Sequence, residues 1–133
     1  MSTLQDNLRV VQSRISAACA GCGRDPSEVT LLAVSKTFHA DAVQELADCG
    51  QRDFGENYIQ EGVDKITFLQ SGANPKANPK TSLIWHCIGP IQSNKTKYVA
   101  EFFSWVHTVD RLKIAQRLND QRPAQLPPLN ICL

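Results

Sequence analysis

The sequence lacks the long apolar segments that mark membrane and secreted proteins. It contains no run of about 18 consecutive apolar residues, so it offers no candidate membrane-spanning helix. Its N-terminus, residues 1–6, has neither the basic start nor the apolar core of a secretory signal peptide. We therefore expect a cytoplasmic protein that contacts no membrane.

An excess of one charge sign is also absent. The 133 residues carry 14 Lys and Arg against 13 Asp and Glu, which leaves a formal net charge of +1. Binding to a nucleic-acid backbone normally requires a basic patch that neutralises phosphates, so we expect no nucleic-acid partner. The hydrophobic fraction of 42% argues against disorder, and the length suits one modest domain or part of a larger one.

The five cysteines form no disulfide or zinc framework. Their number is odd and their spacing is irregular, which fits reduced thiols. Cys19 and Cys22 have CxxC spacing, but a structural zinc would require a second Cys/His pair, and the three histidines are isolated. A redox CxxC opens a helix after a strand, whereas this one follows a predicted helix. We interpret both cysteines as ordinary helix-end residues.

A repeated strand-then-helix pattern is what the sequence does contain. An apolar stripe at steps of three and four residues predicts a first helix from about residue 3 to residue 20. Apolar runs bounded by turn residues then predict strands, each followed by an amphipathic helix. The predicted strands are 29–36, 52–55, 83–88 and 105–109, with a fifth that begins at Leu129; the predicted helices are 40–49, 58–70, 94–103 and 111–120.

Two further predictions concern local structure. Asp110 is expected to be the N-cap of helix 111–120, in which Leu112, Ala115 and Leu118 are expected to face inward. The repeated Asn-Pro-Lys of residues 73–80 predicts an exposed loop, because proline supports neither a helix interior nor a strand ladder.

The order of the elements indicates the fold class. Successive strand-helix units predict an α/β protein with a parallel sheet, and the lack of a glycine-rich phosphate fingerprint favours a (β/α) barrel over a dinucleotide-binding sheet. A complete barrel needs on the order of 250 residues, and this sequence ends within the apolar run 130–133. We expect residues 1–133 to form one incomplete barrel domain, whose uncovered sheet edges and inner strand faces favour self-association.

The first predicted strand, 29–36, ends in a lysine. Both of its faces are apolar up to that end, which is typical of a strand buried on both sides in a parallel sheet. Leu32, Val34 and Lys36 share one face. Ligands of such folds bind beyond the carboxyl ends of the strands, where a lysine amine can form an imine with an aldehyde cofactor. A solvated lysine that closes a strand is the alternative, and the local sequence alone favours it.

Three motifs follow the first three predicted strands. They are AVSKT at 33–37, FGENYIQE at 54–61 and WHCIGPIQSNK at 85–95. Together they resemble the pyridoxal phosphate homeostasis proteins (the YggS/PROSC family), over nearly the whole chain but only over the N-terminal half of a family member. The resemblance implies the N-terminal half of a (β/α)8 barrel of the alanine racemase N-terminal-domain type. It also implies that pyridoxal 5′-phosphate (PLP) is held as an imine on Lys36, where burial would favour the reactive, unprotonated amine.

The same resemblance assigns roles to further residues. Asn57 matches a pocket asparagine near the cofactor ring, although it suits the N-cap of the next helix equally well. His86 shares a strand face with Ile88; it could face the barrel mouth, but a satisfied core histidine is favoured. Residues 92–94 form a loop at the ligand face, where Ser93 is equally suited to cap a helix. The loops that hold the cofactor phosphate in the family follow later strands, which this sequence does not contain.

The implied function is that of a non-catalytic, monomeric carrier or regulator that keeps vitamin B6 in balance, with PLP-dependent enzymes as candidate recipients. Two alternatives stay open. A racemase-like enzyme would need a second base on the opposite face of the cofactor, which nothing in this sequence supplies. A truncated half-barrel would no longer retain the cofactor, because an imine on Lys36 without a phosphate anchor is open to hydrolysis.

Overall fold

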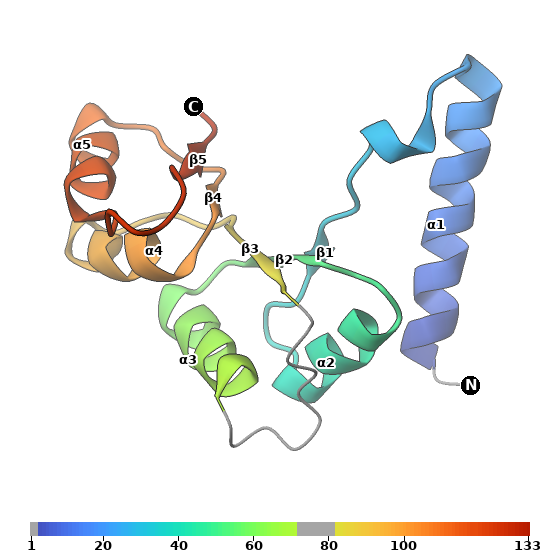
Figure 1. Cartoon of the computed structure of the whole chain (residues 1–133), viewed down its shortest axis with the longest axis horizontal. Coiled ribbons are helices and arrows are strands. Elements are labelled where there is room, and N and C mark those ends of the chain that lie inside the picture. Colours follow the sequence, from blue (N-terminus) through green and yellow to red (C-terminus); the bar gives the residue numbers. More distant parts are fainter. Residues whose placement is uncertain (1–2, 72–81) are drawn as a thin grey trace.

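The computed structural model describes residues 3–71 and 82–133, so the predicted loop 73–80 lies outside the described residues (Figure 1). Helices and strands alternate along the chain as predicted. The elements are α1 (Thr3–Cys22), the 3-10 helix η1 (Pro26–Glu28), β1 (Ala33–Val34), α2 (Ala40–Asp48), β2 (Asp53–Glu56), α3 (Ile59–Gln70), β3 (Ile84–Cys87), the 3-10 helix η2 (Ser93–Lys95), α4 (Thr96–Phe102), β4 (Trp105–Val106), α5 (Leu112–Gln121) and β5 (Asn130–Ile131).

The strands form one parallel sheet in the order β1-β2-β3-β4-β5. One row of residues in register crosses the whole sheet, because each residue is paired with the next one on the neighbouring strand. These residues are Val34, Gly55, His86, Trp105 and Asn130. Helices α2 to α5 lie around one side of the strands in Figure 1. The α/β class and the sequential parallel sheet are therefore as predicted.

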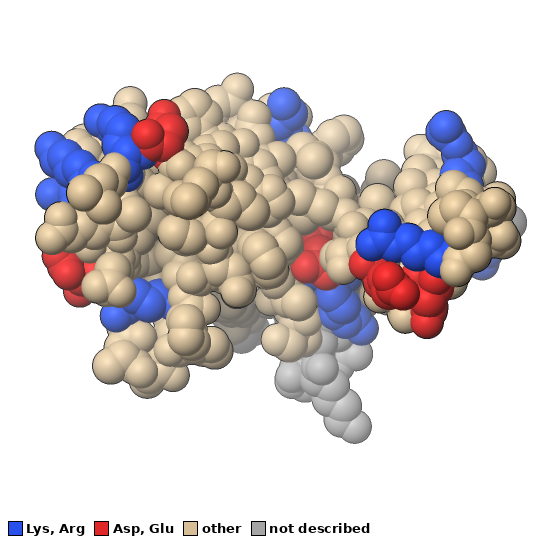
Figure 2. Space-filling model, turned by 90° about the horizontal axis from the view of Figure 1, so that it is seen from above, with Lys and Arg blue, Asp and Glu red and all other residues tan. Residues whose placement is uncertain are grey.

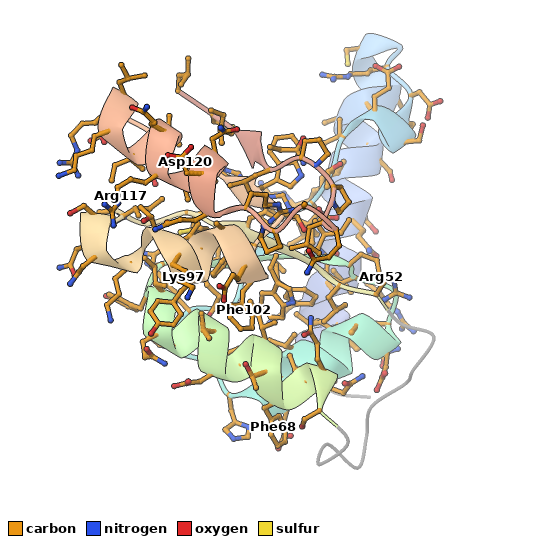
Figure 3. All side chains as sticks on the ribbon, turned by 60° about the vertical axis from the view of Figure 1, so that its left-hand side comes forward. Arg52, Phe68, Lys97, Phe102, Arg117 and Asp120 are labelled. Carbon is orange, nitrogen blue, oxygen red and sulfur yellow. The ribbon has the colours of Figure 1, made fainter. Side chains whose placement is uncertain are left out.

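The hydrophobic core lies between the sheet and these helices. Alternation along the strands sends one set of side chains into this core, and apolar stripes on the helices meet them. The core includes Phe54, Trp85, Cys87 and Val106 from the strands and Val43, Ile66, Val99, Phe103, Ile114 and Leu118 from the helices and their ends. Polar contacts join neighbouring helices at its margin: Arg117, labelled in Figure 3, reaches from α5 to α4, where its Nε donates to Thr96 Oγ1 at 3.2 Å.

The first strand is much shorter than predicted, and it is not buried on both faces. Among the described residues β1 pairs only with β2, so it is an edge strand, and the side chain of Val34 is 48% exposed. Before β1, the Leu31 carbonyl accepts a hydrogen bond from the Gln51 side chain at 2.7 Å rather than from a neighbouring strand. The apolar run 29–36 thus forms a ladder only near its carboxyl end.

Two predictions about α5 are wrong. Leu112 is 82% exposed, whereas Ile114 and Leu118 are fully buried, because the inward stripe follows the i, i+4 spacing of those two residues. Asp110 is not the N-cap. Since the helix begins at Leu112, the cap position falls on Arg111, which makes no capping bond through its side chain.

Helix α1 runs through the CxxC pair and ends at Gly23, whose φ of +72° suits glycine. Cys19 is buried and Cys22 is exposed, as ordinary helix-end residues. Across the described ranges, no three His, Cys, Asp or Glu side chains are grouped so that they could hold a metal ion. None of the described helices is long and apolar enough to cross a membrane. On the face shown in Figure 2, basic and acidic side chains are scattered and most of the surface carries neither.

Candidate functional site

Lys36 lies at the carboxyl end of β1, two residues beyond the last one assigned to the strand. Its side chain is exposed, so the expected burial is not found in this chain. Within the described residues its ammonium makes no hydrogen bond or ion pair. The amine is therefore accessible to a ligand, and no side chain in residues 3–71 or 82–133 competes for it.

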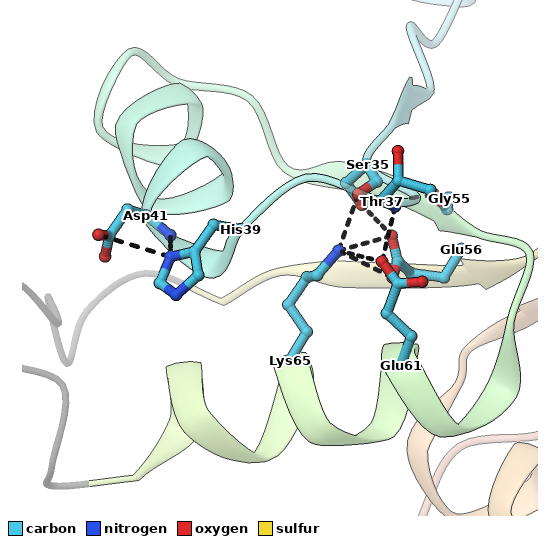
Figure 4. Close-up of polar contacts among 8 residues, drawn as sticks. All are labelled: Ser35, Thr37, His39, Asp41, Gly55, Glu56, Glu61 and Lys65. Carbon is cyan, nitrogen blue, oxygen red and sulfur yellow. Dashed lines mark hydrogen bonds and ion pairs between the residues drawn. The ribbon is translucent and has the colours of Figure 1, made fainter.

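The two neighbours of Lys36 are held firmly. The Ser35 backbone N–H donates to the Gly55 carbonyl at 3.0 Å, and the buried Ser35 hydroxyl donates to Glu56 Oε2 at 2.5 Å. On the other side, the Thr37 N–H donates to Glu61 Oε1 at 2.6 Å (Figure 4). Thr37 has a φ of +65°, a left-handed conformation that is unusual for a β-branched residue and needs support from its surroundings.

Lys65, on α3, connects these contacts. Its Nζ donates to the Ser35 carbonyl at 2.8 Å and to Glu56 Oε1 at 3.0 Å, and it lies 3.5 Å from Glu61 Oε1 (Figure 4). The side chains of Lys65 and Glu56 are only 5% and 1% exposed, so this is a buried ion pair. All three donors of the ammonium have acceptors, as a buried charge requires. We call Ser35, Thr37, Glu56, Glu61 and Lys65 the Lys65 network.

A glycine allows α3 to approach β2 closely enough for these contacts. A Cβ on Gly62 would lie 3.0 Å from the ring of Phe103 and 3.2 Å from the Cβ of Glu56. The absence of a side chain at this position thus brings the first turns of α3 against the end of β2. Glu61 and Lys65, four residues apart on α3, then face the segment that carries Lys36.

The Lys65 network is not predicted by the sequence. Its only sequence signal is the i, i+4 spacing of Glu61 and Lys65, which is common among solvated surface pairs and does not reveal burial.

Asn57 follows β2 as Lys36 follows β1. Because Val34 and Gly55 are paired, and because Lys36 and Asn57 each come two residues later, both residues lie at the same edge of the sheet. The N-cap interpretation of Asn57 is wrong, since the cap position of α3 is Tyr58, which makes no side-chain capping bond. The Asn57 backbone instead packs against Gly89, on which a Cβ would lie 2.3 Å from the Asn57 carbonyl oxygen.

His86 is 7% exposed, and both of its ring nitrogens are engaged. Nε2 lies 2.8 Å from Asp53 Oδ2, and Nδ1 lies 2.9 Å from His107 Nε2. The ring also stacks on Trp105, with 5.7 Å between centroids and 6° between planes. These contacts agree with the favoured interpretation, a core histidine with satisfied hydrogen bonds. Burial, and secondarily the nearby His86, lower the pKa of His107 from its usual value.

The chain is thus an α/β protein with a sequentially ordered parallel sheet and an accessible lysine at the carboxyl end of its first strand. No family model matches the sequence. Proteins named pyridoxal phosphate homeostasis protein are 58% identical to all 133 residues in Escherichia coli strain K12 and 56% identical in Pseudomonas aeruginosa strain PAO1. The chain covers 54% of each, so it spans about half the length of these relatives. It is a homologue of the pyridoxal phosphate homeostasis proteins over that segment, which confirms the resemblance.

Solved structures agree with this relationship. PipY from Synechococcus elongatus, with PLP bound, matches 90% of this chain and 48% of its own chain, with a TM-score of 0.68 and 34% identity. A protein of unknown function from Bifidobacterium adolescentis matches 89% of this chain and 49% of its own, with a TM-score of 0.72 and 27% identity. Both are similar to this chain over about half of their own length.

Proposed function

We propose that this chain binds PLP as part of a protein of vitamin B6 homeostasis, and that Lys36 holds the cofactor. The observation that carries the proposal is the exposed Lys36 at the carboxyl edge of the sheet, whose amine has no partner among the residues that the structure describes. The PLP-bound state of the similar protein PipY supports it.

The residues at this edge fit the aldehyde end of the cofactor. An unprotonated Lys36 amine would bond to the aldehyde carbon, and the aldehyde oxygen would leave as water, so that an imine forms without any redox partner. Asn57, at the same edge of the sheet and with its backbone packed against Gly89, is our candidate neighbour of the cofactor ring. We also propose His86 as a cofactor-binding residue, from its place in the motif. Because its two ring nitrogens already have partners, it would act through the position of its ring and not through a new hydrogen bond.

We also propose that residues 1–133 are the N-terminal half of a (β/α)8 barrel of the alanine racemase N-terminal-domain type. The sequential strand order supports this architecture, as does the length of the relatives, of which the chain spans about half. In this architecture the loops that hold the cofactor phosphate follow later strands. Exposed apolar side chains on the edge strands, Val34 and Ile131, would then be covered by those strands or by self-association.

A carrier or regulator is the proposed activity, with PLP-dependent enzymes as the proposed recipients. The names of the homologues support a homeostasis role rather than racemisation. Racemisation would require a second base opposite Lys36 across the cofactor. We assign that role to no residue of this chain.

The proposal is tested by incubating the 133-residue chain with PLP, recording the imine absorbance, reducing with borohydride and locating the modified lysine by peptide mass spectrometry. We expect one modified site, Lys36. Lys36→Ala should abolish the labelling, whereas Lys97→Ala, a control at a lysine whose side chain is 70% exposed, should retain it. Equal modification of Lys36 and Lys97 would show that Lys36 is only one surface amine among others.

A second experiment separates loss of the cofactor from a wrong assignment of Lys36. The chain is extended at its C-terminus by the segment that its homologues carry beyond the matched region, and PLP retention is measured by dialysis. Retention should increase, because the added strands would supply the phosphate anchor. Failure of the extended chain to retain PLP would overturn the proposed function.

A further inference from the structure

We propose that Glu61 and Lys65, with the buried Glu56, are positioning residues that fix the backbone of Lys36 for attack on an aldehyde. The inference deepens the function proposed above and rests on the assignment of Lys36 as the imine lysine. Nothing in the motifs or in the names of the homologues assigns a role to Lys65 or to its two acidic partners.

The geometry constrains both peptide units that meet at the Lys36 Cα. The unit before it contains the Ser35 carbonyl, which accepts from Lys65 Nζ at 2.8 Å. The unit after it contains the Thr37 N–H, which donates to Glu61 Oε1 at 2.6 Å. With both units anchored to the same buried group of charges, φ and ψ of Lys36 have little freedom (Figure 4). The direction in which its side chain leaves the backbone is therefore set.

The network takes the place of sheet hydrogen bonds at this point. Beyond the Ser35 N–H bond to Gly55, the described residues give the segment of residues 36 and 37 no ladder bond to a neighbouring strand; the Phe38 N–H closes a turn over it by donating to the Ser35 carbonyl at 3.1 Å. A strand end of this kind frays readily, and the left-handed Thr37 adds local strain. Bonds in which one partner is charged are shorter and stronger than neutral ones. Here they hold the backbone that the sheet leaves unsupported.

The network acts through the backbone of the lysine. Ser35 faces the helices, where its hydroxyl meets Glu56, and none of the described contacts of the network involves the Lys36 side chain. Glu56, Glu61 and Lys65 thus contact the backbone that carries Lys36 rather than its amine. Their effect is to restrict geometry, and small errors of position at a reacting group slow a reaction strongly.

The closing experiment uses Glu61, because its side chain is 34% exposed and its removal leaves the buried pair of Lys65 and Glu56 in place. Glu61→Ala removes the acceptor of the Thr37 N–H, and Glu61→Gln keeps an oxygen there. The matched control is Asp64→Ala, which removes an exposed carboxylate of the same helix that, among the described residues, accepts a hydrogen bond only from Gln60. Two quantities are measured in the 133-residue chain: the hydrogen-exchange rate of the Thr37 amide and the rate at which PLP and borohydride label Lys36.

We expect Glu61→Ala to speed exchange at Thr37 by about tenfold, as for the loss of one charge-assisted hydrogen bond. Exchange of the Ala42 amide in α2, whose N–H donates to the carbonyl of the cap residue His39, should not change. Lys36 labelling should slow severalfold relative to Asp64→Ala, and Glu61→Gln should restore most of the rate. If Glu61 only stabilised the fold, its removal would not change the exchange rate of Thr37 relative to that of Ala42. Nor would it slow the labelling of Lys36 selectively.

Equal labelling rates in Glu61→Ala and Asp64→Ala would overturn the inference. If the unsubstituted chain is not labelled at Lys36, the extended chain decides the proposed function, and the exchange data alone decide whether Glu61 positions the backbone. In that case faster exchange confined to Thr37 in Glu61→Ala supports the positioning role of Glu61, and unchanged exchange overturns it.

Discussion

His86 and His107 lie with ring nitrogens 2.9 Å apart across the neighbouring strands β3 and β4. His86 Nε2 also lies 2.8 Å from Asp53 Oδ2, so each ring nitrogen of His86 has a hydrogen-bonding partner. One proton at most can lie between the two rings. A positive charge on both neighbouring rings would be repulsive, and burial together with the nearby His86 lowers the pKa of His107.

This arrangement predicts a loss of stability at mildly acidic pH. The unfolded His107 gains its proton near the usual pKa of 6.5, whereas the folded one gains it only at lower pH, because burial and His86 lower its pKa. Above pH 6.5 both states are neutral at this residue, and as the pH falls below it the unfolded state binds more protons, so folding weakens.

His107→Gln should flatten this dependence while leaving a hydrogen-bonding side chain beside His86. The measurement is the thermal midpoint by circular dichroism between about pH 7.5 and pH 5. His39→Asn is the control, because it removes an exposed histidine and keeps a capping side chain at the start of α2. If His107→Gln and the unsubstituted chain lose stability equally over this range, His107 does not cause the loss.

The order of strands and helices was predictable from the sequence because it depends on local signals. Amphipathic spacing and glycine stops located α2, for which Val43 and Ala47 are buried and Gly50 adopts a φ of +104°. The length of β1 was not predictable, since it depends on which neighbours are present. The interpretations of Asn57 and Asp110 as helix N-caps were wrong, because several residue types suit a cap position and only the backbone path selects among them.

The candidate site was predictable only in part, for a similar reason. The position of Lys36 followed from its place in the motif and at the end of a strand. The Lys65 network brings together residues 30 apart in sequence, such as Ser35 and Lys65, and no period in the sequence encodes that contact. The partners of His86 likewise come from β2 and from the residue that follows β4, and only the observed register reveals them.

Substitution by alanine should have opposite effects on stability at two glycines. A Cβ on Gly89 would lie 2.3 Å from the Asn57 carbonyl oxygen, so Gly89→Ala must displace backbone and should destabilise the chain by about 1–3 kcal/mol or more. Gly21 lies within α1 with nothing within 4 Å of an added Cβ, so Gly21→Ala should stabilise by about 0.5–1 kcal/mol. Urea denaturation measures both. A neutral Gly89→Ala would mean that the loop after β3 does not hold Asn57.

The cysteines should differ sharply in reactivity. Burial raises the pKa of the Cys87 thiol to about 11, so the reactive thiolate is scarce at neutral pH, and the side chain is fully buried in the core. Cys22 and Cys49 are exposed. Iodoacetamide at pH 7.5 should modify these two in the native chain and reach Cys87 only after unfolding, as read by peptide mass spectrometry. Native modification of Cys87 at the rate of Cys49 would contradict this burial.

The buried pair of Lys65 and Glu56 should show strong energetic coupling. Removing one member leaves the other charge buried without a partner, so Lys65→Met should destabilise the chain by about 3–5 kcal/mol. Lys97→Met, at an exposed lysine, should change stability by no more than about 0.5 kcal/mol.

Combining Lys65→Met with Glu56→Gln should recover part of that loss. The uncompensated carboxylate is then gone, while the glutamine oxygen still accepts from the Ser35 hydroxyl. Urea denaturation of the unsubstituted chain, the two single variants and the double variant gives a double-mutant cycle. We expect a coupling free energy of about 0.5–3 kcal/mol between Lys65 and Glu56. Strict additivity would mean that the two charges do not interact in the folded chain. The double variant also lacks the ammonium that binds the Ser35 carbonyl, so its Lys36 should label more slowly with PLP even where its stability is recovered.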